Sequence, residues 1–401
     1  MAPLSSITIF MNKRIKPISI WAVVIIADLL IACVFAELWV RLFVPVKNVQ
    51  YILDDKIGVR FAPNQRTYGY AERGYSNILL TNSFGMHDVE RNLNKGVNSC
   101  RVQVYGGSAV SGIGVKIEET IPSYLEKFMN EHYRGELIEV MNMAVGDDGT
   151  ASQLLTYKEI GRRFGPDLVV CLFMDDFADN IVETDGRDYP PHYDIDDSGH
   201  LHFIPPRIRD LSAAWEQLKE QSLLCRQISN KFIESKTCKE LLLVLNRILF
   251  RPRGDGWRTL KEYRKDICLK KALPVTLNLI KRFRDTVEED GARFVVMDGH
   301  KFSDEYVGSE FQNSDFEQFC RSNSIAYIPA YKGTVELWNS PRYYFKDLHL
   351  NAEGNREAAY FAAAQLIKFL PKPGTAVLDH IEEREPNVYG ERTEANHTQV
   401  H

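Results

Sequence analysis

Apolar and polar positions follow two different patterns along this chain. A long continuous apolar run comes first, and beyond residue 100 short apolar runs alternate with amphipathic stretches. Short runs rich in valine are typical of buried strands, and apolar residues spaced by three or four are typical of helices. Strands are predicted at 101–105, 137–141, 168–173, 293–297 and 325–328. Helices are predicted at 119–132, 151–163, 273–289, 313–322 and 352–369. This alternation favours an α/β fold, with helices on both faces of a mostly parallel sheet.

The first apolar run, residues 18–40, is long enough to cross a membrane. As a helix it extends about 34 Å at ~1.5 Å per residue, against a hydrocarbon core of ~30 Å. It exceeds the apolar part of a secretory signal, and no clear small-x-small cleavage site follows, so we expect an uncleaved signal anchor. Basic residues at 13, 14 and 16 favour a cytoplasmic tail at 1–17, although Arg41 and Lys47 weaken the asymmetry. We expect a single-pass protein of the cell inner membrane whose main domain is exported to the periplasm or extracytoplasmic space.

Asp28 stands in the middle of this predicted span. A carboxylate at that depth is costly and usually faces a polar cavity or a partner helix. A membrane partner helix at Asp28 is therefore one interpretation, and a protonated or merely tolerated aspartate in a single-pass anchor is the other.

Residues 45–100 are turn-rich and predict a lead-in subdomain of short strands. A long insertion interrupts the alternating pattern at about 180–270. Its first part, YDIDDSGHLHF at 193–203, predicts a hairpin. The H-x-H spacing of His200 and His202 would also suit a metal site. Two histidines are only half of a usual ligand set, however, and the aspartates and glycine between the strands are ordinary turn residues. We therefore predict no metal.

The second part of the insertion, 207–253, is predicted to be helical and is basic. It suits a cap over a site, a surface for acidic glycans or lipid head groups, or a solvated face. The polar tail at 371–401 is predicted to be disordered, because it lacks the apolar residues needed to form a core.

Composition excludes some classes of function. The 401 residues are 44% hydrophobic and 26% charged, with a net charge of −5 and no basic stripe, which argues against a nucleic-acid partner. The seven cysteines include no C-x-x-C pair, so a zinc ribbon or thioredoxin-type site is not supported. They suit either disulfides in an oxidising compartment or small buried apolar side chains, and Cys171, within LVVCLF, suits the second.

The most distinctive chemistry follows the first predicted strand, in VYGGSAVSGIGV at 104–115. Ser108 follows two glycines at the strand end, which let the backbone turn sharply and let a substrate approach the hydroxyl. The segment is neither the G-x-S-x-G elbow, because position 110 is Val, nor a P-loop, because it lacks the lysine. A glycine-rich loop that turns the chain or cradles a phosphate is the alternative.

A nucleophilic serine needs a base, and Asp347 and His349 precede the last amphipathic helix. An aspartate two residues away can orient the imidazole, so that its other nitrogen faces the serine. The alternative is an exposed loop histidine beside a helix capped by Asn351. Oxyanion donors are expected from the loops at 142–149, where Gly146 lets a substrate approach closely, and 173–180. Loops at the carboxyl ends of parallel strands converge on one crevice.

Four segments in order, VYGGSAVSGIGV, VMNMAVGDDGTASQ, PDLVVCLFMDDFADN and DLHLNAEGN, resemble the motifs of bacterial SGNH (GDSL-type) hydrolases. NSFGMHDVE at 82–90 resembles a stretch that precedes the nucleophile block in membrane-anchored members. The resemblance covers roughly 45–370 outside the insertion. It implies a flavodoxin-like three-layer α/β/α sandwich at 101–370. It also implies a triad of Ser108, Asp347 and His349, with oxyanion donors from the serine N–H, Gly146 and an asparagine.

Two departures from that pattern affect the expected activity. The spacing Asp-x-His is one residue shorter than the commoner form. The asparagine expected in the third block is Asp175, and an ionised carboxylate cannot donate to an oxyanion. Either Asp175 is protonated beside Asp176, or Asn180 takes its place, or activity is weak or absent.

We therefore predict a membrane-anchored serine esterase that needs no cofactor and acts on acyl groups, such as O-acetyl esters, of an envelope polysaccharide or lipid. One alternative is an O-acyltransferase with the same triad. The other is a catalytically silent glycan-binding or assembly protein.

Overall fold

The structure of the chain is a computed structural model. It describes residues 17–43, 51–68, 78–133, 137–146, 149–174, 176–181, 191–196, 198–205, 222, 224–225, 265–299, 302, 307, 310–329, 341–345 and 349–370. The predicted tail at 371–401 and nearly all of the predicted helical part of the insertion lie outside these residues. The chain divides into two compact units, one formed by 1–47 and 208–256 and the other by 48–207 and 257–401.

The larger unit is built on five parallel strands: β5 (Ser99–Tyr105), β6 (Leu137–Asn142), β7 (Leu168–Phe173), β10 (Arg293–Asp298) and β11 (Ala326–Ile328). They lie in the order β11-β10-β7-β5-β6, with every neighbouring pair parallel. All five strands were predicted, and the order is the flavodoxin-like one. The chain turns from β5 to β6 on one side and then crosses to β7 on the other. Ligands bind at such a reversal, beyond the carboxyl ends of the strands.

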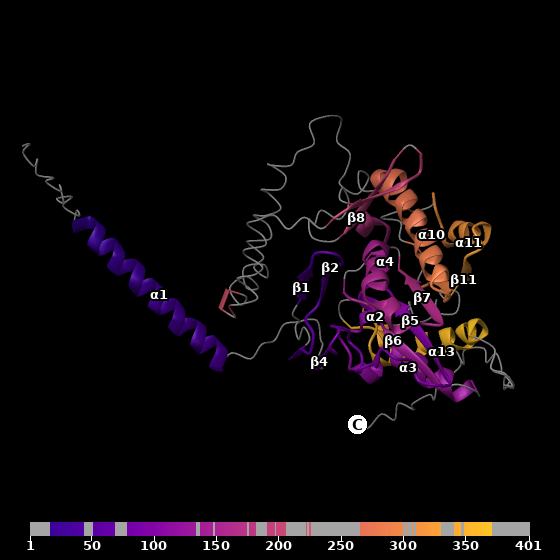
Figure 1. Cartoon of the computed structure of the whole chain (residues 1–401), viewed down its shortest axis with the longest axis horizontal. Helices are drawn as coiled ribbons and strands as arrows, with labels where there is room; N and C mark the ends of the chain where they lie inside the picture. The colour runs from indigo at the N-terminus through magenta and orange to yellow at the C-terminus, as the bar shows by residue number, and fades with distance from the viewer. Residues whose placement is uncertain are drawn as a thin grey trace, which may run out of the picture. The chain divides into compact units, whose positions relative to one another are not determined.

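Helices cover both faces of this sheet, which confirms the three-layer α/β/α class (Figure 1). One face packs against α3 (Ile121–His132) and α13 (Ala352–Leu366). The other packs against α4 (Thr150–Glu159), α10 (Leu273–Glu289) and α11 (Asn313–Ser322). The central strands β5 and β7 are buried along their whole length, which explains the continuous apolar run LVVCLF of β7, whereas β5 also carries the buried polar residues Arg101 and Gln103.

Two helices end earlier than predicted and tighten into 3-10 turns. The helix expected to reach residue 163 ends at Glu159, and the turn Gly161–Phe164 follows. A Cβ at Gly161 would lie 2.0 Å from the hydroxyl of Tyr105, so only glycine allows this close approach. The last helix likewise ends at Leu366 rather than at 369.

The lead-in segment forms two small hairpins, β1–β2 (Tyr51–Asp54 and Gly58–Phe61) and β3–β4 (Arg66–Tyr68 and Ile78–Leu80). Their buried side chains pack with Val145, in the loop after β6. These short strands therefore border the loop expected to supply an oxyanion donor.

The first part of the insertion is the predicted hairpin, β8 (His192–Ile195) paired with β9 (Leu201–Ile204). Asp196 organises its turn by accepting hydrogen bonds from the backbone of Ser198 and His200, 2.9 Å each. The hydrogen bond with His202, together with these backbone donors, lowers the pKa of Asp196 to about 2. Among the described residues, no group of three His, Cys, Asp or Glu side chains is placed to hold a metal ion.

The N-terminal run forms helix α1 (Pro17–Phe43). Its segment Ala22–Val40 is the one helix among the described residues that is long and apolar enough to cross a membrane. A signal sequence has the same length and composition, so these two properties alone do not distinguish a retained anchor from a cleaved signal.

Candidate active site

Ser108 begins α2 (Ser108–Ser111), a single helical turn that follows β5 directly. The tight turn depends on Gly106, where a Cβ would lie 2.5 Å from Val110 Cγ2 and 3.1 Å from the carbonyl oxygen of Leu172. Any larger residue would push the turn away from β7. Gly106 is therefore required by packing, and this close approach accompanies the sharp turn that the sequence predicted.

A buried amide holds the far end of this turn. Asn142, which ends β6 and is 1% exposed, directs its side-chain nitrogen at three carbonyl oxygens. They belong to His87 at 3.1 Å, Val110 at 3.2 Å and Ser111 at 3.5 Å. The first two are good hydrogen bonds, and the third is at the limit. Asn142 thus fastens the nucleophile turn to the neighbouring strand.

His87 supports the same turn from the lead-in segment. Its Nδ1 lies 2.8 Å from the carbonyl oxygen of Ser111, so Nδ1 carries the proton and donates. The side chain is fully buried. Burial lowers the pKa of His87 to about 4, although the bond to Ser111 and the charge of Glu118 oppose this shift. The imidazole is therefore neutral at physiological pH.

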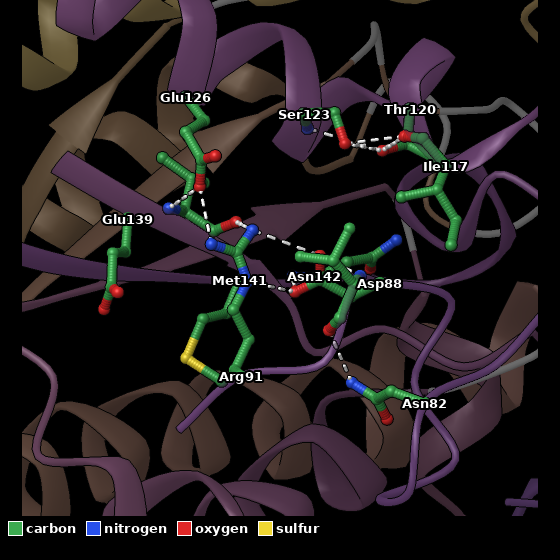
Figure 2. Close-up of polar contacts among 12 residues, drawn as sticks. Asn82, Asp88, Arg91, Ile117, Thr120, Ser123, Glu126, Glu139, Met141 and Asn142 are labelled. Carbon is green, nitrogen blue, oxygen red and sulfur yellow. Dashed lines mark hydrogen bonds and ion pairs between the residues drawn. The ribbon is translucent and has the colours of Figure 1, made fainter. Parts of the chain in front are cut away.

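An ionic network fixes the backbone on which Asn142 stands (Figure 2). Asp88 accepts from the backbone N–H of Asn142 at 3.2 Å and pairs with Arg91. Arg91 also donates to the carbonyl of Val140 at 3.0 Å and pairs with Glu126 at 2.8 Å. The network joins the lead-in segment, β6 and α3, so the end of β6 has little freedom to move.

The NSFGMHDVE stretch therefore has a structural explanation. The side-chain oxygen of Asn82 accepts from the backbone N–H groups of Phe84 and Met86, 3.0 Å each, and so shapes the turn that delivers His87. Gly85 has φ +75°, and a Cβ there would lie 2.4 Å from the carbonyl oxygen of Phe61. Only glycine suits that position.

The histidine loop is closed by its own backbone at the start of α13. Asn351 caps that helix by accepting from the N–H groups of Glu353 and Gly354, 3.0 Å each, as the sequence suggested. Its own N–H donates to the carbonyl of Tyr343 at 2.9 Å. The buried amide of Asn355 donates to Glu119 at 3.0 Å, in the turn that precedes α3. These bonds set the loop beside the segment that follows the nucleophile turn.

The structure brings the predicted serine and histidine together. The Nε2 atom of His349 lies 2.8 Å from Oγ of Ser108, although 241 positions separate them in the chain. The backbone carbonyl of His349 accepts from Phe345 at 2.8 Å, which fixes the position of the loop. When the ring carries its proton on Nδ1, the serine hydroxyl donates to Nε2, which is the arrangement required for removing the hydroxyl proton. Asp347 lies outside the described residues.

Gly146 lies at the edge of the lead-in hairpins. A Cβ at this position would lie 3.1 Å from Ile113 Cδ1 and 3.3 Å from the hydroxyl of Tyr51. Ile113 follows the nucleophile turn and Tyr51 begins β1, so these three segments meet at Gly146. The sequence did not indicate Tyr51 as a neighbour of the site, because it lies outside the motifs. Ile113 lies within VYGGSAVSGIGV, but its approach to Gly146 depends on tertiary packing that the motif does not reveal.

The loop after β7 contains the departure from the family pattern. Asp175 lies outside the described residues. The neighbouring Asp176 accepts a hydrogen bond from the hydroxyl of Thr150 at 3.2 Å, at the start of α4. Asp176 is therefore linked to a helix on the face opposite α3 and α13.

Asn180 has a structural role that argues against it as a replacement donor. Its side-chain nitrogen donates to the carbonyl of Asp176 at 2.8 Å and to Thr276 Oγ1 at 2.9 Å. Its oxygen accepts from the backbone of Ala151 at 2.8 Å. Both amide hydrogens are engaged within the fold, so neither is directed at a substrate.

The described cysteines carry free thiols: Cys33, Cys100, Cys171, Cys225, Cys268 and Cys320. Cys171 is fully buried in β7, as predicted, and burial raises the pKa of its thiol well above the usual range. It is therefore an apolar core residue and not a nucleophile.

No family model matches the sequence, and no curated protein matches it. Solved structures that are similar to the chain include the psychrotrophic esterase EstA from Pseudoalteromonas sp., at 11% identity and TM-score 0.37, covering 68% of this chain and 100% of that one. The lipase/acylhydrolase from Enterococcus faecalis has 11% identity and TM-score 0.37, with 69% and 99% covered. A two-domain esterase active on acetylated mannans has 10% identity and TM-score 0.35, with 69% and 53% covered.

Proposed function

We propose that the chain is a membrane-anchored serine esterase of the SGNH type that cleaves acyl esters. The observation that carries the proposal is the 2.8 Å separation of Ser108 Oγ and His349 Nε2. The position of the pair supports the same conclusion, because Ser108 follows the strand at which the chain order of the sheet reverses. A serine hydroxyl and an imidazole nitrogen in hydrogen-bond contact form the basic unit of nucleophilic acyl transfer.

The proposed reaction has two halves. In the first, His349 takes the proton of Ser108 as the oxygen attacks the ester carbonyl, and then gives that proton to the departing alcohol. An acyl-serine remains. In the second, His349 takes a proton from water, the hydroxide attacks the acyl-serine, and the proton returns to Ser108 as the acid leaves. Asp347 is assigned to orient the imidazole through Nδ1, on the resemblance alone. No cofactor takes part.

Oxyanion stabilisation is assigned to the backbone N–H groups of Ser108 and Gly146. Gly146 suits this role because Ile113 and Tyr51 crowd the space that a side chain would need. Asp175 replaces the amide donor of the family, and the loss of one such donor costs about 10²–10³ in rate. We therefore expect slow turnover unless Asp175 is protonated.

The proposed substrates are O-acyl esters, acetyl esters among them, of an envelope polysaccharide or lipid. This assignment follows from the proposed anchoring by α1 with the larger unit outside the cytoplasm, since an anchored enzyme meets envelope polymers and lipids rather than soluble metabolites. Acyl transfer to a sugar hydroxyl would use the same pair, with the hydroxyl replacing water in the second half.

Ester turnover in two serine variants tests the proposal. The full chain in detergent is offered p-nitrophenyl acetate and an acetylated glycan, with and without an acceptor sugar. Ser108→Ala is expected to lose all measurable turnover. The control is Ser111→Ala, in the same short helix, whose hydroxyl only donates to the carbonyl of Ser108 at 3.0 Å. Equal turnover by wild type and Ser108→Ala would overturn the proposal, and no turnover by the wild type would favour a binding protein.

A further inference from the structure

Glu37 is an acidic residue within the membrane-length segment Ala22–Val40. Its carboxylate accepts two hydrogen bonds from a distant part of the chain, from Ser222 Oγ at 2.7 Å and from the backbone N–H of Leu224 at 2.9 Å. The hydroxyl of Ser222 in turn accepts from the backbone of Cys225 at 3.1 Å. A carboxylate within an apolar helix is expensive unless it is hydrogen-bonded in this way.

Burial along α1 supports the same contact. From Ala22 to Phe35 the side chains are exposed, whereas Ala36 and Glu37 are half-buried and Val40 is 8% exposed. Residues separated by three or four share one face of a helix. The covered face thus includes Glu37 and lies in the last turns of the span, within the unit that combines 1–47 with 208–256.

We propose that α1 is retained in the mature protein, and that its last turns are the docking surface for the part of the insertion that contains Ser222, Leu224 and Cys225. This inference rests on the proposed membrane anchoring by α1, but not on the proposed esterase chemistry. Glu37 stands three residues before the end of the candidate span, a rise of about 4.5 Å along a helix. The contact therefore holds Ser222, Leu224 and Cys225 near the membrane surface on the side where α1 ends.

The contact also distinguishes an anchor from a signal sequence. A signal sequence leaves the mature protein, so the hydrogen bonds from Ser222 and Leu224 would lose their acceptor. Asp28, the other acidic residue of the span, has an exposed side chain in the stretch where α1 is uncovered. It provides a matched control for the removal of a carboxylate from the same helix.

The thiol of Cys225 reports on the docked segment. The full chain is reconstituted in lipid nanodiscs, and the alkylation rate of Cys225 by N-ethylmaleimide is followed by peptide mass spectrometry. Because hydrogen bonds to a charged group contribute most to holding such a segment, Glu37→Leu is expected to raise that rate about tenfold or more. Ser222→Ala is expected to give a smaller increase. The double variant is expected to have the same Cys225 alkylation rate as Glu37→Leu, because removing Glu37 already breaks the hydrogen bond that Ser222→Ala would break.

Two controls separate undocking from unfolding. Asp28→Leu is expected to leave the Cys225 rate unchanged, and the buried thiols of Cys100 and Cys171 are expected to stay unreactive in every variant. An unchanged Cys225 rate in Glu37→Leu would overturn the inference. So would a mature chain whose intact mass shows that it begins after Glu37. Ester turnover is measured on the same samples, so failure of the esterase proposal is seen separately.

Discussion

Asn142 and Asn180 are both buried; Asn142 is the last residue of β6 and Asn180 lies in the loop after β7, and these two strands flank β5. Asn142 directs its amide at the backbone that carries Ser108, and it stands on a strand held by Asp88 and Arg91. Asn180 directs its amide away from that turn, to Thr276 in α10, and its oxygen to the start of α4. One amide therefore organises the nucleophile, and the other organises the packing of two helices.

The two sides of β5 therefore have different roles around Ser108. On the β6 side, neutral and ionic groups hold the backbone around Ser108 in one position before any substrate binds. On the β7 side, the residue expected to serve the chemistry is an aspartate, and the nearby asparagine is already engaged. A backbone that is already held in place needs no reorganisation during a reaction, so the β6 side is suited to position the backbone N–H of Ser108 for a substrate. The β7 side is where we expect the enzyme to be slow.

The largest expected effect comes from removing the imidazole. His349→Ala is expected to lower kcat for ester hydrolysis on the order of 10⁴-fold, because no other described group contacts Ser108 Oγ as a base. Steady-state turnover of p-nitrophenyl acetate measures the loss. The matched control is His200→Ala, on the exposed turn of the β8–β9 hairpin, which should leave kcat unchanged. A comparable loss in both variants would mean that the effect is not local to the site.

The next effect is a gain on the β7 side. Asp175→Asn is expected to raise kcat about 10²-fold, because it restores an amide donor where a carboxylate repels the developing charge. Asp176→Asn is the paired control, since Asp176 accepts from Thr150 and should yield no gain. Turnover that is unchanged or lower in Asp175→Asn would show that position 175 does not face the oxyanion.

The pH dependence of stability tests the β6 side. The pKa of His87 is about 4 in the folded chain against its ordinary value of 6.5, so the unfolded chain binds the proton more readily. Stability is therefore full above about pH 6.5 and falls as the pH drops towards 4, by about 3 kcal/mol in total. Thermal unfolding of the full chain in detergent from pH 4 to 7 measures the slope. His87→Gln should flatten this slope, and a slope equal to that of the wild type would contradict the assignment.

The smallest effect separates the two asparagines directly. Asn142→Ala and Asn180→Ala should each lower stability by roughly 1–3 kcal/mol, because each leaves buried polar groups without a partner. Only Asn142→Ala should also lower kcat, by about tenfold, when both are compared well below their unfolding temperatures. If Asn180→Ala loses kcat by 10² or more while remaining folded, the asparagine serves the chemistry after all.

Much of the fold was predictable, because the buried strands are short and rich in valine and other apolar residues and alternate with amphipathic helices along the chain. The tight turn that carries Ser108 was predictable for a different reason. Only glycine fits at position 106, so the glycine itself indicates that the turn packs closely against β7. The pairing of Ser108 with His349 followed from four motifs in order, whereas the local pattern alone favoured an exposed loop histidine.

The supporting contacts could not be predicted, because they depend on tertiary neighbours that no local period reveals. His87 looks like any loop histidine until it is placed under Ser111. Glu37 is a charged residue in an apolar run, and no sequence pattern predicts that Ser222 donates to it. The same reason explains Asn180, which suited a donor role by its type and position but has a packing role in the structure. Asp347 stays a prediction from the resemblance.

The central claim is that His349 activates the hydroxyl of Ser108, and covalent labelling tests it most directly. The full chain is treated with a fluorophosphonate, which forms an oxygen–phosphorus bond to an activated serine and releases fluoride, and the modified peptide is located by mass spectrometry. We predict rapid labelling at Ser108 in the wild type and labelling slowed by orders of magnitude in His349→Ala. Labelling at another residue, or equal rates in both proteins, would contradict the account.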